Sequence, residues 1–252
     1  MGQEFESPLW FFFVGRLAQR QSICFTRRGL QVQILHRPQM KSKKEKNLKF
    51  GNCEKLLWKK GYKNVLFIDE VGRGSVAGPL VLGGVVLERK FNLKENWIKS
   101  VKDSKKLTPK KREDIFKIAG KHPLIHWKIV RISNKIIDKI NILEALKMGV
   151  KKITQAFNKE RELDFLIIDG NTKFQINFPY RSIIKADDKI FSCSLASIIT
   201  KVKRDELMKK LHKTYPKFSF DKNKGYGTQE HFDSIKTNGF CPIHRKSFLK
   251  SL

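Results

Sequence analysis

Four acidic residues follow segments of the chain that are expected to form strands. They are Asp69, Glu70, Asp169 and Asp187. The first two come after the apolar run 65–68, the third after the run 163–168, and the fourth after the shorter segment 181–185. Acids at the carboxyl ends of strands line the ligand crevice of an α/β sheet. Any one of them alone could merely cap a turn, but together they predict a site of converging carboxylates.

Converging carboxylates need a counter-charge, and hard divalent cations such as Mg²⁺ or Mn²⁺ take oxygen ligands of this kind. Two such ions roughly 3.5–4 Å apart can activate water and stabilise the leaving oxygen of a phosphodiester. We therefore expect Asp69, Glu70, Asp169 and Asp187 to be both the metal-binding and the catalytic residues.

A glycine-rich loop follows the first acidic pair directly. Gly72 and Gly74 allow the backbone to approach a ligand and to aim its N–H groups at it, and Arg73 between them offers a fork for phosphate. A Gly-x-Gly pattern alone is weak evidence. Its position beside Asp69 and Glu70 makes a phosphate-bearing substrate the favoured interpretation.

The charge balance favours a polyanionic partner. The 252 residues hold 53 Lys plus Arg against 24 Asp plus Glu, a formal net charge of +29. Such an excess is typical of proteins that bind nucleic acid. The alternative is a lysine-rich surface that serves only solvation.

Alternating strand and helix signals should position these residues. The expected strands are 65–68, 76–87, 124–132, 163–168 and 181–185. The expected helices are a short one around 56–58, and 108–119, 141–157, 190–212 and 228–237. Thr108 followed by Pro109 is typical of a helix start, and Asn141 with Glu144 resembles a capping box. The pattern predicts one α/β domain with a mixed central sheet flanked by helices.

The N-terminal segment differs from the rest. Residues 1–39 are rich in Gln and Arg and resemble a translated transfer-RNA gene, so we expect a spurious or disordered extension with the true start at Met40. Residues 40–60 read as a charged lead-in with a short helix, and residues 61–252 as the catalytic domain. The apolar run 9–14 is far too short to span a membrane. The four cysteines form no Cys-x-x-Cys pair, which fits a reducing, cytoplasmic compartment.

Eight motifs, in order from residue 64 onward, resemble those of the ribonuclease HII family. They are Asp69-Glu-Val-Gly-Arg-Gly74, Asp103-Ser-Lys-Lys-Leu107, Asn141-Ile-Leu143, Ile168-Asp-Gly-Asn171, Ile184-Lys-Ala-Asp187, the helix with Ala196-Ser-Ile198 and Arg204-Asp205, Lys224-Gly-Tyr-Gly-Thr228, and His244-Arg245 with Ser247-Phe248. One such motif would be weak evidence, but eight at compatible spacing are strong. One departure is Ser75-Val76, where the family more usually has Pro-Leu.

The resemblance implies a ribonuclease H-like fold and an endonuclease that cuts the RNA strand of RNA–DNA hybrids. Its substrates would include single ribonucleotides embedded in duplex DNA, its products would carry 5′-phosphate and 3′-hydroxyl ends, and its setting would be DNA replication and repair. The four acids would bind Mn²⁺ or Mg²⁺. The residues implied as substrate-binding are Gly72, Arg73 and Gly74 for the 2′-hydroxyl, Tyr226 for the next sugar, and Lys105, Lys106 and Lys224 for phosphates.

Simpler interpretations stay open for several of these residues. Tyr226 could only pack its loop, and Lys105 and Lys106 could only be solvated. His231 and His244 are expected to hold structure through hydrogen bonds. Arg204 and Asp205 are expected to form a structural ion pair near the site.

Two further functions compete with the first. A ribonuclease HIII would also cut hybrids, but that family usually has Gly-Thr-Gly at residues 72–74 and a separate N-terminal binding domain. A basic nucleic-acid-binding protein without catalysis would bind in the presence of a chelator and would not cut. Four acids argue against it, because carboxylates repel phosphate unless a metal intervenes. We expect a monomer and no membrane partner, and no clear clamp-binding motif is seen.

Overall fold

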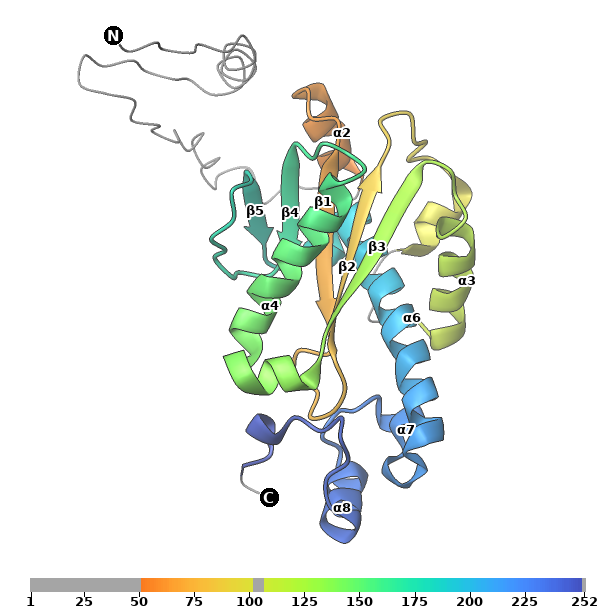
Figure 1. Cartoon of the computed structure of the whole chain (residues 1–252). Coiled ribbons are helices and arrows are strands. Elements are labelled where there is room, and N and C mark those ends of the chain that lie inside the picture. Colours follow the sequence, from red (N-terminus) through yellow and green to blue (C-terminus); the bar gives the residue numbers. More distant parts are fainter. Residues whose placement is uncertain (1–50, 102–106, 251–252) are drawn as a thin grey trace, which may run out of the picture. The chain divides into compact units, whose positions relative to one another are not determined.

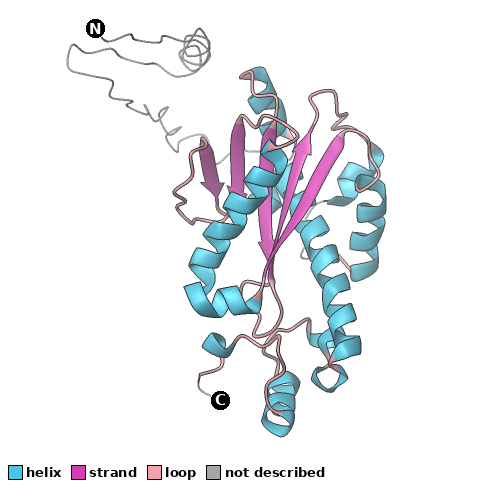
Figure 2. Cartoon of the chain, in the orientation of Figure 1, coloured by secondary structure: helices cyan, strands magenta, loops and turns pink. Residues whose placement is uncertain are grey.

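A computed structural model describes residues 51–101 and 107–250. A mixed five-stranded sheet lies at its centre, in the order β3-β2-β1-β4-β5 (Figures 1 and 2). The strands are β1 (Val65–Val71), β2 (Leu80–Leu87), β3 (Ile125–Ile132), β4 (Phe165–Asp169) and β5 (Tyr180–Ile183). β1 pairs antiparallel with β2, and β2 with β3, whereas β1, β4 and β5 run parallel. The expected mixed α/β sheet is confirmed.

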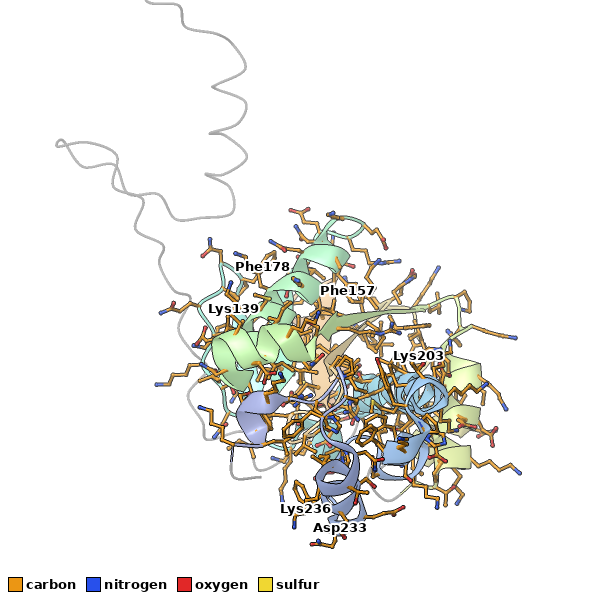
Figure 3. The ribbon with its side chains drawn as sticks, turned by 60° about the horizontal axis from the view of Figure 1, so that its bottom comes forward. Lys139, Phe157, Phe178, Lys203, Asp233 and Lys236 are labelled. Carbon is orange, nitrogen blue, oxygen red and sulfur yellow. The ribbon has the colours of Figure 1, made fainter. Side chains whose placement is uncertain are left out.

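Helices cover both faces of the sheet. The α-helices are α2 (Asn52–Lys59), α3 (Pro109–Ala119), α4 (Asn134–Asn158), α5 (Ala186–Lys189), α6 (Phe191–Thr214), α7 (Phe220–Asn223) and α8 (Gln229–Asn238). The 3₁₀ turns are η2 (Asn96–Val101), η3 (Pro216–Phe218) and η4 (Lys246–Phe248). Figure 3 looks at the end of the molecule where α8 lies, and shows Lys139 of α4 and Lys236 of α8 at its surface.

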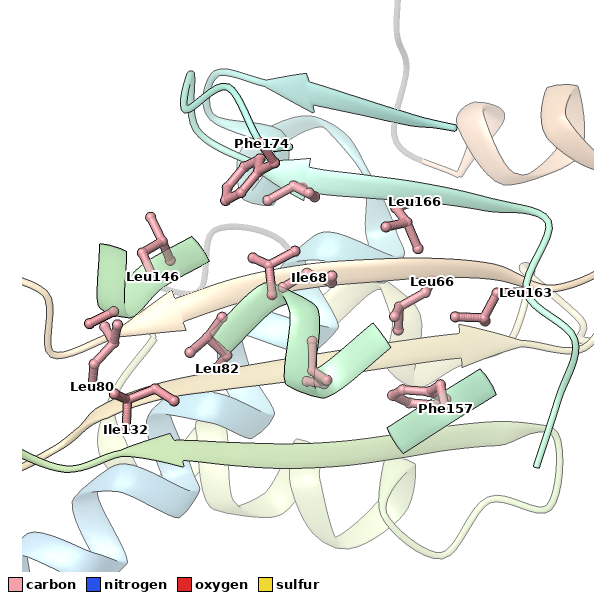
Figure 4. Packing of buried hydrophobic residues seen from close by; sticks show 14 of the residues in the cluster. Leu66, Ile68, Leu80, Leu82, Ile132, Leu146, Phe157, Leu163, Leu166 and Phe174 are labelled. Carbon is pink, nitrogen blue, oxygen red and sulfur yellow. The ribbon is translucent and has the colours of Figure 1, made fainter. Parts of the chain in front are cut away.

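The side chains of β1 alternate between the two faces of the sheet, which explains why helices pack on both faces. Leu66 and Ile68 belong to the cluster that packs under α4 (Figure 4). Val65 and Phe67 point to the other face, where they pack with Ile190 and Cys193 at the start of α6. Successive side chains of a strand point to opposite faces, so a continuous apolar run indicates a strand that is buried on both sides.

Two helix starts were predicted to the residue. The hydroxyl of Thr108 accepts a hydrogen bond from the Lys111 amide before α3, with Pro109 as first helical residue. The hydroxyl of Thr228 accepts from the His231 amide before α8. In both cases the side chain satisfies an amide that the helix leaves without a partner.

The expected helix behind Asn141 is confirmed, but α4 begins earlier, at Asn134. Asn141 breaks the helical geometry at φ 64° and ψ 170°. Its side-chain oxygen accepts hydrogen bonds from the Leu143 and Glu144 amides, at 2.9 and 3.1 Å. Asn141 therefore caps a helical segment as predicted. The helical segment that precedes it, from Asn134 up to the break at Asn141, was not predicted.

Two strand boundaries differ by three residues or more from expectation, and the others by one or two. β1 continues through Asp69 and Glu70 to Val71, because those residues stay paired with β2. β2 begins at Leu80, not at Val76, because residues 72–79 form the loop instead. Both acids of the pair thus lie inside a strand, where the backbone fixes them more firmly than a turn would.

Some expectations fall outside the described residues. These are the N-terminal extension 1–39 and the two lysines Lys105 and Lys106. Among the residues that are described, no helix has the length and apolar character needed to cross a membrane.

Candidate active site

The four acids gather at one end of the three parallel strands. Asp69 and Asp169 each follow the last paired residues, Ile68 and Ile168, of neighbouring strands. Asp187 lies in α5, the short helix that follows β5. An Asp169 carboxylate oxygen accepts a hydrogen bond from the Ala186 amide at 2.5 Å, which ties α5 to the end of β4. The structure therefore brings the predicted residues together.

Asp69 is one of two fully buried carboxylates of this group, with Asp187 as the other. Asp69 is 5% exposed, and one of its oxygens accepts a hydrogen bond from the Glu70 amide at 2.8 Å. Burial raises the pKa of Asp69 well above its ordinary value, and the charges of Glu70 and Asp169 raise it further. A hydrogen bond from Ser197 on α6 opposes these effects. Ser197 was missed by sequence reasoning, although it lies in a quoted motif.

Glu70 shares the same electrostatic environment. Burial raises its pKa to about 7, Asp169 and Asp187 raise it as well, and Arg73 opposes them. One Arg73 nitrogen lies 3.7 Å from a Glu70 carboxylate oxygen. The acids thus repel one another in a desolvated place, and a bound cation would relieve that repulsion.

The donor set fits a hard divalent cation, since every candidate ligand atom is a carboxylate oxygen. In the described part of the chain, no group of three or more His, Cys, Asp or Glu side chains is placed so that it could hold a metal ion by itself. Mg²⁺ in particular keeps several waters and is commonly held by one or two carboxylates together with substrate phosphates. An open arrangement of acids matches that mode of binding.

The glycine loop, residues 72–79, leads away from the acids and is held by Arg245. The Arg245 guanidinium donates to the carbonyls of Gly72, Arg73 and Gly78, at 2.7, 3.0 and 3.0 Å. Burial lowers the pKa of Arg245 to about 9, so it is charged at neutral pH. Gly72 takes φ 90°, a left-handed conformation that favours glycine.

Arg204 corrects one expectation, because it does not form an ion pair with Asp205. Lys201 forms that pair instead, at 2.8 Å. The Arg204 side chain is fully buried under the glycine loop and donates to the Ser75 hydroxyl at 2.9 Å. It also donates to the Lys224 carbonyl at 2.8 Å. Sequence reasoning missed this role because the helical register alone does not say which way Arg204 points.

The tyrosine loop, residues 223–228, lies against the glycine loop. The amides of Val76 and Ala77 both donate to the Gly225 carbonyl, at 2.9 and 3.0 Å. The Tyr226 ring is 37% exposed and is thus available to a ligand. The Lys224 ammonium contacts the Asp221 carbonyl, and burial lowers its pKa.

A buried histidine pair supports the tyrosine loop from behind, as the expected structural role requires. The Cys241 amide donates to His244 Nδ1 at 2.8 Å, so a neutral His244 carries its proton on Nε2. His231 Nε2 lies 3.1 Å from that atom, and His231 Nδ1 lies 2.8 Å from the Tyr226 carbonyl. The consistent assignment has His244 donating to His231, and His231 donating to Tyr226.

The ribonuclease HII family model matches residues 66–251. The ribonuclease HII of Caldicellulosiruptor saccharolyticus is 41% identical over 203 residues, 81% of this chain and 95% of that protein. The ribonuclease HII of Clostridioides difficile is 36% identical over 250 residues, 99% of this chain and 93% of that protein.

Solved structures agree in fold. The ribonuclease H2 of Pyrococcus horikoshii has a TM-score of 0.60 at 28% identity, over 73% of this chain and 93% of that one. A ribonuclease HII of Archaeoglobus fulgidus, solved in complex with PCNA, has a TM-score of 0.61 at 22% identity, over 75% and 95%. Bst-RNase HIII, solved in complex with Mn²⁺, has a TM-score of 0.52 at 18% identity, over 74% of this chain and 65% of that one.

The fold and the family match together define a ribonuclease H-type endonuclease, a metal-dependent hydrolase that acts on RNA in RNA–DNA hybrids. Within that class, the chain belongs to the ribonuclease HII family. The recognition made from the eight motifs is confirmed.

Proposed function

We propose that this enzyme cuts duplex DNA at a single embedded ribonucleotide as well as within longer RNA–DNA hybrids, using Asp69, Glu70, Asp169 and Asp187 as metal-binding and catalytic residues. One observation carries the proposal. The charges of Asp169 and Asp187 raise the pKa of both Asp69 and Glu70 at one end of the sheet, and the glycine loop starts from the same strand end.

A pair of divalent cations, Mn²⁺ or Mg²⁺, would supply an activated water and stabilise the leaving oxygen. The protein's own part is to fix the acids. β1 and β4 hold Asp69 and Asp169 on neighbouring strands, and the Ala186 amide orients Asp169. Hydrolysis in this arrangement leaves a 5′-phosphate and a 3′-hydroxyl.

Recognition of the ribose falls to the loops beside the acids. The 2′-hydroxyl separates RNA from DNA and can both donate and accept. In this proposal Gly72, Arg73 and Gly74 contact it, chiefly through the backbone. Tyr226 stacks on the next sugar and so favours an RNA–DNA junction, and Lys224 neutralises a phosphate. Lys105 and Lys106, outside the described residues, complete the proposed phosphate contacts.

The substrate proposal is tested with the full chain and a DNA duplex that contains one ribonucleotide, with Mn²⁺ or Mg²⁺. We expect cutting on the 5′ side of the ribonucleotide, abolished by EDTA and by Asp69→Asn. Cutting of a long hybrid alone would favour the type HIII activity. Binding without any cutting, in either metal, would overturn the proposal.

We further propose that the enzyme acts as a monomer in the cytoplasm. Three cysteines of the described chain, Cys53, Cys193 and Cys241, are free and buried, which fits a reducing compartment. Light scattering of the purified chain and fractionation of the cells that make it test the two statements separately.

A further inference from the structure

Two arginines are fully buried at the glycine loop and the tyrosine loop, where a charged side chain is unusual. Arg204 and Arg245 are both 0% exposed. Within the described residues, neither forms an ion pair with a carboxylate, and their donors go almost entirely to main-chain carbonyls. Burying an arginine is costly. A pair of buried arginines is therefore expected to fix a geometry that hydrophobic packing cannot fix.

Arg245 determines which way the glycine loop faces. It binds the carbonyls of Gly72 and Arg73, which turns both inward. In a planar trans peptide the C=O of one residue and the N–H of the next point in opposite directions. The amides of Arg73 and Gly74 therefore point away from Arg245. Neither amide donates to another described residue, and both residues are exposed.

Arg204 joins that loop to the tyrosine loop. On one side it donates to the Ser75 hydroxyl and to the Ala77 and Pro79 carbonyls, at 2.9, 3.3 and 3.3 Å. On the other side it donates to the Lys224 carbonyl, and its guanidinium carbon lies 5.5 Å from the centre of the Tyr226 ring.

The fit of Arg204 beneath the glycine loop is tight. A Cβ placed on Gly72 would lie 2.2 Å from Arg204 Nε. On the opposite side of the contact, a Cβ on Gly225 would lie 2.4 Å from the Ala77 carbonyl oxygen. Neither loop can shift relative to the other without displacing the guanidinium or breaking its hydrogen bonds.

We propose that Arg204 and Arg245 are positioning residues for ribose recognition: Arg245 presents the Arg73 and Gly74 amides outward, and Arg204 fixes their distance from Tyr226. The inference rests on the proposed function of these loops. Neither guanidinium contacts the substrate, and each acts through the peptides or the ring that it holds. A lysine cannot replace either one, because a single ammonium is compact and lacks the planar fork that reaches several carbonyls.

The role of Arg245 is tested by binding. In the Asp69→Asn background, which we expect to bind without cutting, the Kd for an all-DNA duplex is divided by the Kd for the same duplex with one ribonucleotide. We expect Arg245→Lys to lower this ratio about tenfold, the value of one lost charged hydrogen bond. The matched control is Arg89→Lys, an exposed arginine that donates to a single carbonyl, that of Trp58.

A merely structural arginine would give another result. If Arg245→Lys lowered the melting temperature but left the Kd ratio within twofold of the Asp69→Asn parent, the proposal would be overturned. If Arg245→Lys fails to fold, hydrogen exchange on the unmutated chain tests the proposal instead. We expect the Arg73 and Gly74 amides to become protected by the ribonucleotide duplex and not by the all-DNA duplex, and equal protection by both would contradict the proposal.

The role of Arg204 is tested by a double-mutant cycle with Tyr226. The readout is the cleavage rate of a single-ribonucleotide duplex divided by that of a uniform hybrid. We expect Arg204→Lys and Tyr226→Ala each to lower the ratio by about five- to tenfold. The double variant should be no worse than Tyr226→Ala alone, whereas multiplying effects would mean that Arg204 does not act through Tyr226.

Ser75→Ala provides a milder version of the same test. It removes one acceptor from Arg204 while leaving the charge and both loops in place. We expect a loss of about twofold in the rate ratio that disappears in the Tyr226→Ala background. A loss of the same size in both backgrounds would count against the coupling. If the unmutated chain did not cut the single-ribonucleotide duplex at all, the proposed function would fail; if it did and the ratios held, only this inference would fail.

Discussion

The acid end and the recognition loops lie side by side, yet they are built in opposite ways. At the acid end, Asp69 and Glu70 are partly or fully buried, and the charges of Asp169 and Asp187 raise the pKa of both. In the loops, Arg204 and Arg245 are also buried, but each donates three or more hydrogen bonds to carbonyl or hydroxyl oxygens.

The acid end and the recognition loops therefore differ in what stabilises them. The acid end is destabilising until a cation enters, so its stability should depend on metal. The two buried arginines of the loops already have internal hydrogen-bond partners, so the loops should keep one conformation without substrate. Buried polar groups that are fully satisfied stiffen a structure, while unsatisfied like charges weaken it. Changes to the acids and changes to the loops should therefore have different effects on stability and activity.

The largest effect is expected from Asp69→Asn. Removing one charge of the acid cluster should lower the cleavage rate by roughly 10³-fold or more, because the metal-binding set is broken. The same change should raise the free energy of unfolding of the metal-free chain, since repulsion between buried like charges is relieved.

Thermal unfolding with and without Mn²⁺ checks the predicted effect of Asp69→Asn on stability. Mn²⁺ should raise the melting temperature of the unmutated chain and leave that of Asp69→Asn almost unchanged. Equal shifts in both proteins would mean that the cation binds elsewhere, and the contrast between the two regions would lose its basis.

The next effect is a loss of stability from Gly72→Ala. The new methyl would overlap Arg204 at 2.2 Å, and the residue would be held at φ 90°. We expect a loss of about 3 kcal/mol, the sum of overpacking and left-handed strain. Gly74→Ala is the matched control for stability, because nothing lies within 4 Å of its Cβ position. Urea unfolding of both variants makes the comparison, and equal losses would refute the tight fit.

A smaller effect concerns pH and the histidine pair. Burial and the neighbouring His231 lower the pKa of His244 to about 4, below the ordinary 6.5. Between these values the unfolded chain binds more protons, so stability should fall as pH drops from 6.5 to 4 and then level off. The contribution is on the order of 3 kcal/mol.

The groups that face the pair are the Tyr226 carbonyl, the Cys241 amide and the rings of Phe218, Phe220 and Phe240, and this apolar surrounding disfavours a charged imidazole. His244→Gln removes the titration. The difference in unfolding free energy between the two proteins should therefore change with pH in that window, and a constant difference would show that His244 titrates normally.

The smallest effect is expected at Tyr226. Its exposed ring is proposed to stack on a sugar, so Tyr226→Ala should lower the cleavage rate of a single-ribonucleotide duplex by about tenfold. Tyr226→Phe keeps the ring and should retain most of the rate. Single-turnover kinetics on that duplex measures both variants, and an equal loss in the two would assign the role to the hydroxyl instead.

Local signals allowed much of the fold to be predicted. The caps at Thr108 and Thr228 marked helix starts to the residue, because a capping hydroxyl and its amide lie within three residues of each other. The early start of α4 was missed, because Asn141 reads as a helix start whether or not another helical segment precedes it. The extension of β1 through Glu70 was missed because pairing with β2 outweighs the poor strand propensity of acids.

The family, the acidic residues and the two loops beside them could be inferred without a structure, since each is carried by residues close together in the chain. What Arg204, Arg245 and the histidine pair do could be read only from the folded domain. Arg204 is 125 residues from its partner Pro79, and Arg245 is 173 from Gly72. The direction of a side chain over such separations is set by the packing of the whole domain, which no local pattern of residues encodes.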